Sequence, residues 1–143
     1  MKVAVFSTKP FDKQVFEKYN QNFAHQLEYF DTSLNRQTTN LTRDFEAVIA
    51  FVNDNIDEEV IQKLSDNNIK MIALRSAGFN NVDIEAAEKY GVKVTRVPAY
   101  SPQAVAEHAL ALILTLNRKT HKAYNLVKEG NFSLNNLIGF NDH

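Results

Sequence analysis

The sequence predicts an α/β domain built on a parallel sheet, and two observations support this fold class. Short apolar, β-branched runs recur about every 20 residues, with segments of helical spacing between most of them, which is typical of βαβ units. The runs at 48–52 and 71–74 are also apolar throughout. Strands that helices cover on both faces have this composition, so helices are expected on both sides of the sheet.

Five strands are expected, in the order of the apolar runs. They are placed at residues 3–6, 27–30, 47–52, 71–74 and 92–97. Between them, apolar residues share helical faces: Val15, Phe16 and Tyr19, then Val60, Ile61 and Leu64, then Ile84 and Ala87. Gly91 stands where a left-handed helix cap is expected. Residues 32–44 are polar and aperiodic, so we expect a loop there with at most a short helix.

Two further helices are expected after the last strand. Ser101 suits the N-cap and Pro102 the first helical position of a helix at 103–117. This helix is apolar almost all round, so it requires partners on most of its sides. A more polar helix should run from Arg118 to about Glu129, with Gly130 as its stop. We interpret the chain, which ends at 139–143 without a closing element, as the front part of a larger enzyme.

Composition narrows the class of protein. The formal net charge is -1 and the charges are scattered, so no basic face suggests a nucleic-acid partner. The sequence has no cysteine, which excludes disulfides, thiolate nucleophiles and cysteine metal sites, and fits a reducing compartment. The N-terminus runs directly into a predicted strand without a signal peptide, and the longest apolar run is too short to span a bilayer. We therefore expect a cytoplasmic protein without a membrane partner.

The candidate site lies in the loops after the strands, because open parallel sheets bind ligands beyond their carboxyl ends. The loop at 75–81 is the most informative, since it joins an apolar strand to a helix and carries Gly78 in its middle. Glycine allows successive backbone N–H groups to point the same way, and such amides favour an anion such as a carboxylate. The alternative is that Gly78 only turns the chain, and that Asn80 or Asn81 only caps the helix.

Other polar residues have less specific interpretations. Tyr100 could offer its hydroxyl to a ligand or simply pack at a hinge, and Arg75 could face an acidic ligand or form a salt bridge. Glu107 and His108 are adjacent, so on a helix they point in different directions and do not form an acid/base pair. We expect His108 to be partly buried and hydrogen-bonded, and the histidine spacing suggests no metal site. Glycine occurs only at 78, 91, 130 and 139, which excludes a G-x-G-x-x-G turn and a P-loop.

Four segments together resemble the NAD-dependent D-lactate dehydrogenases of the D-isomer-specific 2-hydroxyacid dehydrogenase family. They are Phe51-Val52-Asn53-Asp54, the run ALRSAGFNNVD at 73–83, RVPAYSP at 96–102 and VAEHA at 105–109. The resemblance implies a flavodoxin-like substrate-binding domain over residues 1–100. It also implies that 101–143 contains inter-domain and dimerisation helices and the truncated start of an NAD-binding Rossmann domain. The helix at 103–117 would then pack on that domain and help form a homo-oligomer.

The resemblance further implies roles for individual residues. The backbone amides of Ala77 and Gly78 would hold the substrate carboxylate, and Tyr100 would lie against the substrate. Phe51 would line the pocket for the substrate side chain, and Val105 would pack near the nicotinamide. No catalytic residue is expected in this chain, because the family's cofactor motif and its catalytic Arg, His and Glu would lie beyond about residue 140. The parent reaction would interconvert pyruvate and D-lactate with NAD(H), and the chain alone would be inactive.

Two other interpretations remain open at this point. The chain could be a non-catalytic module that dimerises through the 103–117 helix and binds small carboxylates. It could also belong to a relative that acts on another 2-hydroxy acid, because Phe51 and Tyr100 alone do not fix the preferred side chain.

Overall fold

The structure is a computed structural model and describes residues 1–135 and 137. The chain divides into two compact units, Met1–Tyr100 and Ser101–His143. This boundary coincides with the one predicted between 1–100 and 101–143, while the roles assigned to the two parts remain predictions.

The first unit is built on a five-stranded parallel sheet, which confirms the predicted fold class. Its strands are β1 (Lys2–Val5), β2 (Gln26–Tyr29), β3 (Ala47–Ala50), β4 (Met71–Leu74) and β5 (Lys93–Thr95). Their order, β2-β1-β3-β4-β5, is that of flavodoxin-like folds. The third and fifth strands end earlier than predicted, so residues 51–52 and 96–97 belong to the loops beyond them. These shorter strands place Phe51 and Arg96 just beyond the carboxyl ends of β3 and β5.

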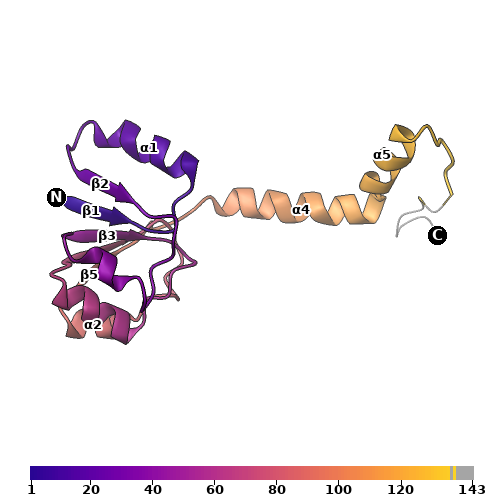
Figure 1. Ribbon diagram of the computed structural model, residues 1–143. Coiled ribbons are helices and arrows are strands. Elements are labelled where there is room, and N and C mark those ends of the chain that lie inside the picture. The colour runs from indigo at the N-terminus through magenta and orange to yellow at the C-terminus, as the bar shows by residue number, and fades with distance from the viewer. Residues whose placement is uncertain (136, 138–143) are drawn as a thin grey trace. The chain divides into compact units, whose positions relative to one another are not determined.

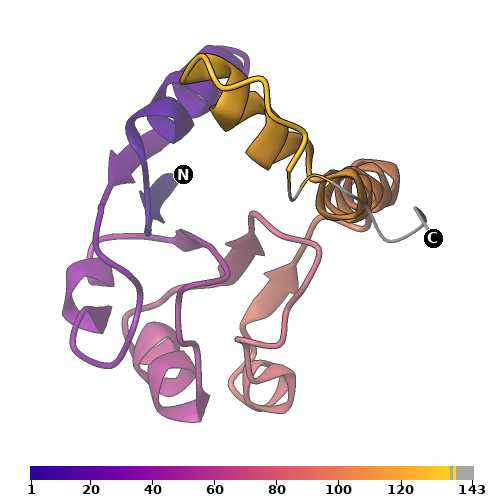
Figure 2. The same ribbon diagram turned by 90° about the vertical axis from the view of Figure 1, so that its right-hand side faces the viewer.

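Helices cover both faces of the sheet. They are α1 (Pro10–Asn20), the 3-10 helix η1 (Thr39–Thr42), α2 (Glu58–Asp66) and α3 (Ile84–Lys89). Figure 1 shows α1 and α2 on opposite sides of the strands, and Figure 2, which views the strands end-on, places η1, α2 and α3 together on the face away from α1. The short helix η1 falls inside the segment predicted to be a loop with at most a short helix.

Most of the hydrophobic core lies on the face that α2 and α3 cover. There the predicted residues Val60, Ile61 and Leu64 are fully buried against side chains of the strands, such as Val48 and Ile72. Burial of each large aliphatic side chain contributes about 1.5–3 kcal/mol to folding. This core fixes the strands from which the site loops extend.

The face beneath α1 is less well packed than the sequence predicts. No residue of α1 is buried, and Val15 and Tyr19 are 53% and 61% exposed. An apolar hollow of about 240 Å³ lies beside the helix, and its lining includes Phe16 of α1 and Ile49 and Met71 of the sheet. Of the predicted face, Phe16 and Tyr19 line this hollow and Val15 does not, and α1 buries none of the three against the strands.

The second unit contains α4 (Pro102–Arg118) and α5 (Thr120–Lys128), close to the predicted bounds. Gly130 follows α5 with a φ of +74°, and Gly91 follows α3 with a φ of +69°, which confirms both as left-handed helix ends. Ser101 is the N-cap residue of α4 and Pro102 begins the helix, as predicted, but the Ser101 hydroxyl makes no capping hydrogen bond. Its carbonyl oxygen instead accepts from the N–H groups of Ala104 and Val105.

The apolar helix α4 has no buried residue, so the partners that its composition requires remain a prediction. The predicted chain end at 139–143 lies outside the residues that the structure describes. Across the described chain, no helix is both long and apolar enough to cross a membrane.

Candidate functional site

The carboxyl ends of β3 and β4 bring two candidate loops side by side. Ala50 pairs with Leu74 at the last position of this ladder, so Phe51 and Arg75 begin neighbouring loops. Farther out, Ile56 and Val82 form an isolated parallel bridge between the same two loops. The two loops are therefore paired at both of their ends. Such pairing gives a binding site a fixed shape.

Asp54 is the central side chain beneath these loops. It is 2% exposed and accepts three hydrogen bonds with its carboxylate. The donors are the Ser7 hydroxyl at 2.6 Å, the Leu34 N–H at 2.8 Å and the Phe51 N–H at 2.6 Å. A buried carboxylate needs such donors to offset its desolvation. Asp54 thus joins the loop after β1, the segment before η1 and the loop after β3.

Asn81 does not cap α3, so that alternative interpretation is wrong. Its side-chain amide donates to the carbonyl oxygens of Phe51 at 3.0 Å and Asp54 at 2.9 Å. The cap of α3 is Asp83, whose carboxylate accepts from the Ala86 N–H at 2.9 Å. Asn81 therefore joins the loop after β4 to the loop after β3.

Arg75 forms a salt bridge, in agreement with the more ordinary of its two interpretations. Its Nη1 lies 2.9 Å from Oδ1 of Asp12 in α1, and both side chains are largely buried. Its Nη2 donates to the carbonyl oxygens of Phe6 and Ser7, each at 2.9 Å. The guanidinium carbon also lies 4.7 Å from the ring centroid of Phe51. Arg75 therefore connects β4 with α1 and with the loops after β1 and β3.

In the loop after β4, the backbone carbonyl oxygens of Ala77 and Gly78 accept hydrogen bonds, whereas their N–H groups donate none to a described residue. The Ser76 hydroxyl donates to the Gly78 carbonyl at 2.8 Å, and Arg96 Nη1 donates to the Ala77 carbonyl at 3.2 Å. Within the described chain, the N–H groups of Ala77 and Gly78 make no hydrogen bond. Two unpaired amides beside a guanidinium are suited to an anion.

Gly78 is required neither by its φ angle nor by its surroundings. It is absent from the residues with positive φ, and a Cβ built on it meets no heavy atom within 4 Å. Glycine is predicted here because it allows successive backbone N–H groups to point the same way, but the φ angle of Gly78 is not one that favours glycine. A glycine that the fold itself does not need leaves room for close approach of a ligand to the backbone.

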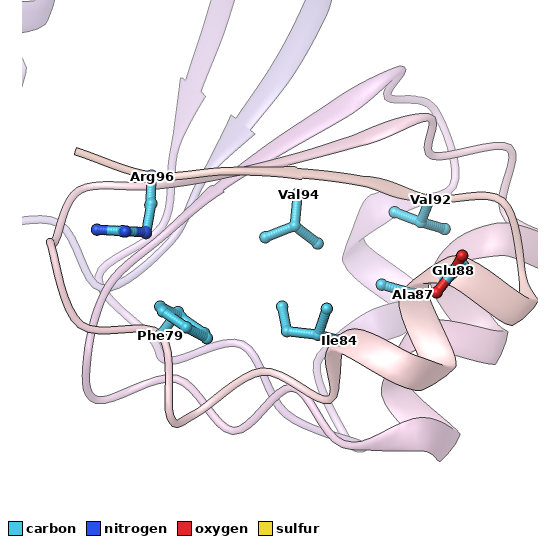
Figure 3. Close-up of a pocket in the computed structure, with 7 residues that line it drawn as sticks. All are labelled: Phe79, Ile84, Ala87, Glu88, Val92, Val94 and Arg96. Carbon is cyan, nitrogen blue, oxygen red and sulfur yellow. The ribbon is translucent and has the colours of Figure 1, made fainter. Parts of the chain in front are cut away.

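Arg96 is a site residue that the sequence analysis missed, because it was assigned to the interior of a strand at 92–97. Its Nη1 also contacts the carbonyl oxygens of Val97 and Pro98, at 3.3 and 3.2 Å. Figure 3 shows its side chain opposite the ring of Phe79, and the guanidinium carbon lies 5.3 Å from that ring's centroid. The available signal was a cation at the carboxyl end of an apolar run.

Beside Arg96 lies an open pocket of about 400 Å³ between β5 and α3. Val94 faces Ile84 across it, with Phe79 and Arg96 at one end and Glu88 at the other (Figure 3). None of the predicted site residues lines this pocket. It adjoins the Ala77 loop only through Phe79 and Arg96.

The remaining predicted residues are less constrained. The Tyr100 side chain is 76% exposed and makes no hydrogen bond or ring contact with another described residue. Val105 lies in the second unit and is 64% exposed. His108 is exposed, contrary to its predicted partial burial. Among the described residues, no group of three or more His, Asp or Glu side chains could hold a metal ion.

Comparison with known proteins identifies the family to which the chain belongs. A family model described as the D-isomer specific 2-hydroxyacid dehydrogenase, catalytic domain, matches residues 3–137. The 2-hydroxyacid dehydrogenase homolog of Haemophilus influenzae is 51% identical over 141 residues, which are 99% of this chain and 43% of the relative. The chain therefore spans less than half the length of that relative.

Solved structures give the same result. The apo-structure of D-lactate dehydrogenase from Escherichia coli is 49% identical, with a TM-score of 0.83 over 98% of this chain and 44% of that one. A D-lactate dehydrogenase with NAD⁺ from Lactobacillus jensenii is 35% identical, with a TM-score of 0.71 over 97% of this chain and 43% of that one. The predicted family is confirmed: the chain belongs to the D-isomer specific 2-hydroxyacid dehydrogenases.

Proposed function

We propose that this chain is the substrate-binding part of an oxidoreductase that interconverts pyruvate and D-lactate with NAD(H). The observation that carries the proposal is the pair of unoccupied backbone N–H groups at Ala77 and Gly78, whose own carbonyl oxygens already accept hydrogen bonds. Membership of the family supplies the reaction class, interconversion of 2-keto and 2-hydroxy acids.

The substrate carboxylate accepts the two amide hydrogens, and Arg96 adds positive charge beside them without giving up its contact with the Ala77 carbonyl. Hydrogen bonds to a charged acceptor are stronger than neutral ones, at about 1.5–3 kcal/mol each. The same two bonds orient the substrate, because they fix the carboxylate plane relative to the sheet edge.

The other site residues contribute shape. Phe51 is half-buried with both backbone polar groups hydrogen-bonded, so it presents a fixed apolar surface to a small substrate side chain such as a methyl group. Tyr100 contributes the wall at the end of the first unit, on a connector that Arg96 ties to the Ala77 loop through the Pro98 carbonyl. Val105 contributes an apolar contact for the nicotinamide.

The strand–helix junctions of the first unit do not fit the phosphates of a dinucleotide. A carboxylate of the chain itself already occupies the start of each α-helix there: Asp12 lies in the first turn of α1, and Asp57 and Asp83 are the N-caps of α2 and α3. A phosphate needs a helix N-terminus free of such groups. We therefore assign no hydride step to these residues, and we expect the 143-residue chain alone not to reduce pyruvate with NADH.

A second copy of the chain is the partner that we propose for α4. Six large apolar side chains of this helix are more than half exposed; they are Val105, Leu110, Leu112, Ile113, Leu114 and Leu116. Contiguous apolar surface on this scale marks an interaction site in a water-soluble protein. The helix predicted at 103–117 thus remains our candidate for a homo-oligomer contact.

An NMR titration of the chain tests the carboxylate site. Pyruvate should shift the amide resonances of Ala77 and Gly78 saturably, and the neutral analogue pyruvamide should not, because only the carboxylate exploits the two free donors. The control resonances are those of Gly91 and Gly130, which lie at helix ends away from the loop. Equal shifts with both compounds, or shifts spread evenly along the chain, would contradict the proposal.

A chimera tests the reaction itself. In it, this chain replaces the aligned 44% of the Escherichia coli D-lactate dehydrogenase. We expect NADH-dependent reduction of pyruvate that Gly78→Val impairs and that Asp31→Ala, at an exposed residue, leaves unchanged. A folded chimera that reduces no 2-keto acid would refute the proposed function, and one that prefers a larger 2-keto acid would assign a different substrate.

A further inference from the structure

We infer that Arg75 is a positioning residue that holds the ring of Phe51 and thereby sets the substrate side-chain preference of the site. This inference rests on the proposed function, in which Phe51 faces the substrate side chain. Arg75 itself touches no substrate in this account.

The main chain at Phe51 is already fixed. Its N–H donates to Asp54 at 2.6 Å, and its carbonyl oxygen accepts from Asn81 at 3.0 Å. The remaining freedom is rotation of the side chain about its two torsions. The guanidinium of Arg75, 4.7 Å from the ring centroid, restricts that rotation by a cation–π contact.

The guanidinium is itself held rigidly. Nη1 is paired with Asp12 at 2.9 Å, and Nη2 donates to the carbonyl oxygens of Phe6 and Ser7 at 2.9 Å each. The Arg75 and Asp12 side chains are 14% and 12% exposed, so solvent screens their attraction little. A planar group fixed at both terminal nitrogens offers the ring a flat, immobile surface.

Lysine cannot reproduce this arrangement. Its ammonium is a point charge on a flexible stem, and it can keep the pairing with Asp12 without presenting a planar face to Phe51. The buried Nε of Arg75 has no hydrogen-bond partner among the described residues. An unsatisfied buried donor costs stability, so stability alone does not explain an arginine at position 75. A role in holding the Phe51 ring explains it, because that role requires the planar shape of the guanidinium.

The experiment compares binding of two acids to the chain and its variants. Dissociation constants for pyruvate and 4-methyl-2-oxopentanoate are measured by NMR for the wild type, Arg75→Lys, Phe51→Leu and the double variant. The matched control is Arg36→Lys, which alters a surface arginine paired with Asp57 and Glu59. Circular dichroism checks that each variant is folded.

We expect Arg75→Lys to reduce the preference for pyruvate by about threefold or more, a size consistent with loss of one cation–π contact. In the Phe51→Leu background the same change should leave the preference unaltered, because Arg75 acts through the ring. Arg36→Lys should change nothing. An equal effect in both backgrounds, or an unchanged preference in folded Arg75→Lys, would overturn the inference.

Two further readouts separate this inference from the proposed function. If the wild type binds neither acid, the proposed function fails, and the aromatic ¹H–¹³C signals of Phe51 still report whether Arg75 holds the ring. Those signals should move in Arg75→Lys and stay in place in Arg36→Lys. If Arg75→Lys does not fold, Asp12→Asn replaces it, because it removes the salt bridge that holds the guanidinium. The Phe51 ring signals and the ratio of the two dissociation constants then test the inference in that variant.

Discussion

The carboxylate of Asp54 accepts the backbone N–H of Phe51 at 2.6 Å while the Asp54 side chain is almost fully buried. The position of Phe51 therefore depends on a charged group three residues farther along the same loop. Because the same carboxylate also accepts from Ser7 and Leu34, the candidate site is connected to the loop after β1 and to the segment before η1. Disturbing Asp54 should affect both the stability and the shape of the site.

Replacing Asp54 tests this relationship. Asp54→Ala should lower the free energy of unfolding by about 2–4 kcal/mol, because it leaves the buried donors of Ser7, Leu34 and Phe51 unsatisfied. Urea unfolding measures the loss. The matched control is Asp31→Ala, an exposed aspartate without a hydrogen bond or ion pair to another described residue, which should change stability by less than about 0.5 kcal/mol. Equal effects of the two substitutions would show that Asp54 does not hold the loops.

Two adjacent asparagines provide a second comparison. Asn81→Ala removes the two hydrogen bonds to the carbonyl oxygens of Phe51 and Asp54 and should cost about 1–2 kcal/mol of stability. Asn80→Ala alters an exposed neighbour whose side chain makes no hydrogen bond to the part of the chain described, so its effect should be negligible. Hydrogen exchange of the Ile56 and Val82 amides should accelerate in the Asn81 variant only. Unchanged exchange there would exclude a bridging role for Asn81.

The fold could be predicted from the sequence because its signals are local. Continuous apolar runs gave the strands, and the spacing of Val60, Ile61 and Leu64 gave the buried face of α2. Strand ends were less predictable: Phe51, Val52 and Val97 continue the apolar pattern although the ladders stop before them. The packing of α1 was not predictable, since an amphipathic pattern does not reveal how closely a helix approaches the sheet.

The candidate site was predicted in part. The loop around Gly78 was found from its position after an apolar strand, and Phe51 and Tyr100 were identified by resemblance. The roles of Asp54, Asn81 and Arg96 depend on contacts between loops that are distant in sequence, such as the 27-residue separation of Asn81 and Asp54. Periodicity and turn composition carry no information about such contacts, so only the structure shows them.

Substitution by alanine should have different effects on the stability of the protein at Gly78 and at Gly91. Gly78→Ala should leave stability unchanged or raise it by up to about 1 kcal/mol, because its φ is not positive and its surroundings are open. Gly91→Ala should lower stability by about 1 kcal/mol, because the residue has a φ of +69°. Thermal or urea unfolding of both variants tests this pair. A destabilised Gly78→Ala would mean that the glycine serves the fold rather than a ligand.

Acid should weaken one surface pair in a defined pH range. The hydrogen bond from Arg36 to Asp57 lowers the pKa of that carboxyl below its ordinary value of 3.8. A lowered folded-state pKa stabilises the protein above pH 3.8, and this contribution is lost as the pH falls through the folded-state pKa. Arg36→Gln should raise the pKa of Asp57 in a ¹³C-detected carboxyl titration. It should also make the loss of stability below pH 3.8 shallower.

Lys89→Gln is the matched control for this titration, because it removes an exposed pair with Glu58 at 2.7 Å and should leave the pKa of Asp57 in place. If Asp57 titrates at the same pH with and without Arg36, the hydrogen bond is not the cause of its low pKa.

The apolar surface of α4 should make the chain self-associate. Leu112 and Leu116 are four residues apart, lie on one side of the helix and are 51% and 62% exposed. Replacing both with glutamate would place two charges in the contact, which desolvation penalises. In size-exclusion chromatography over a concentration series, the wild type should move from monomer to dimer, and the double variant should remain monomeric. The control is Lys122→Glu in α5, which also introduces a negative charge but places it outside the apolar surface of α4. This variant should associate as the wild type does. A wild-type chain that stays monomeric at every concentration would show that α4 needs a different partner, since its exposed leucines would then not suffice to bring two copies together.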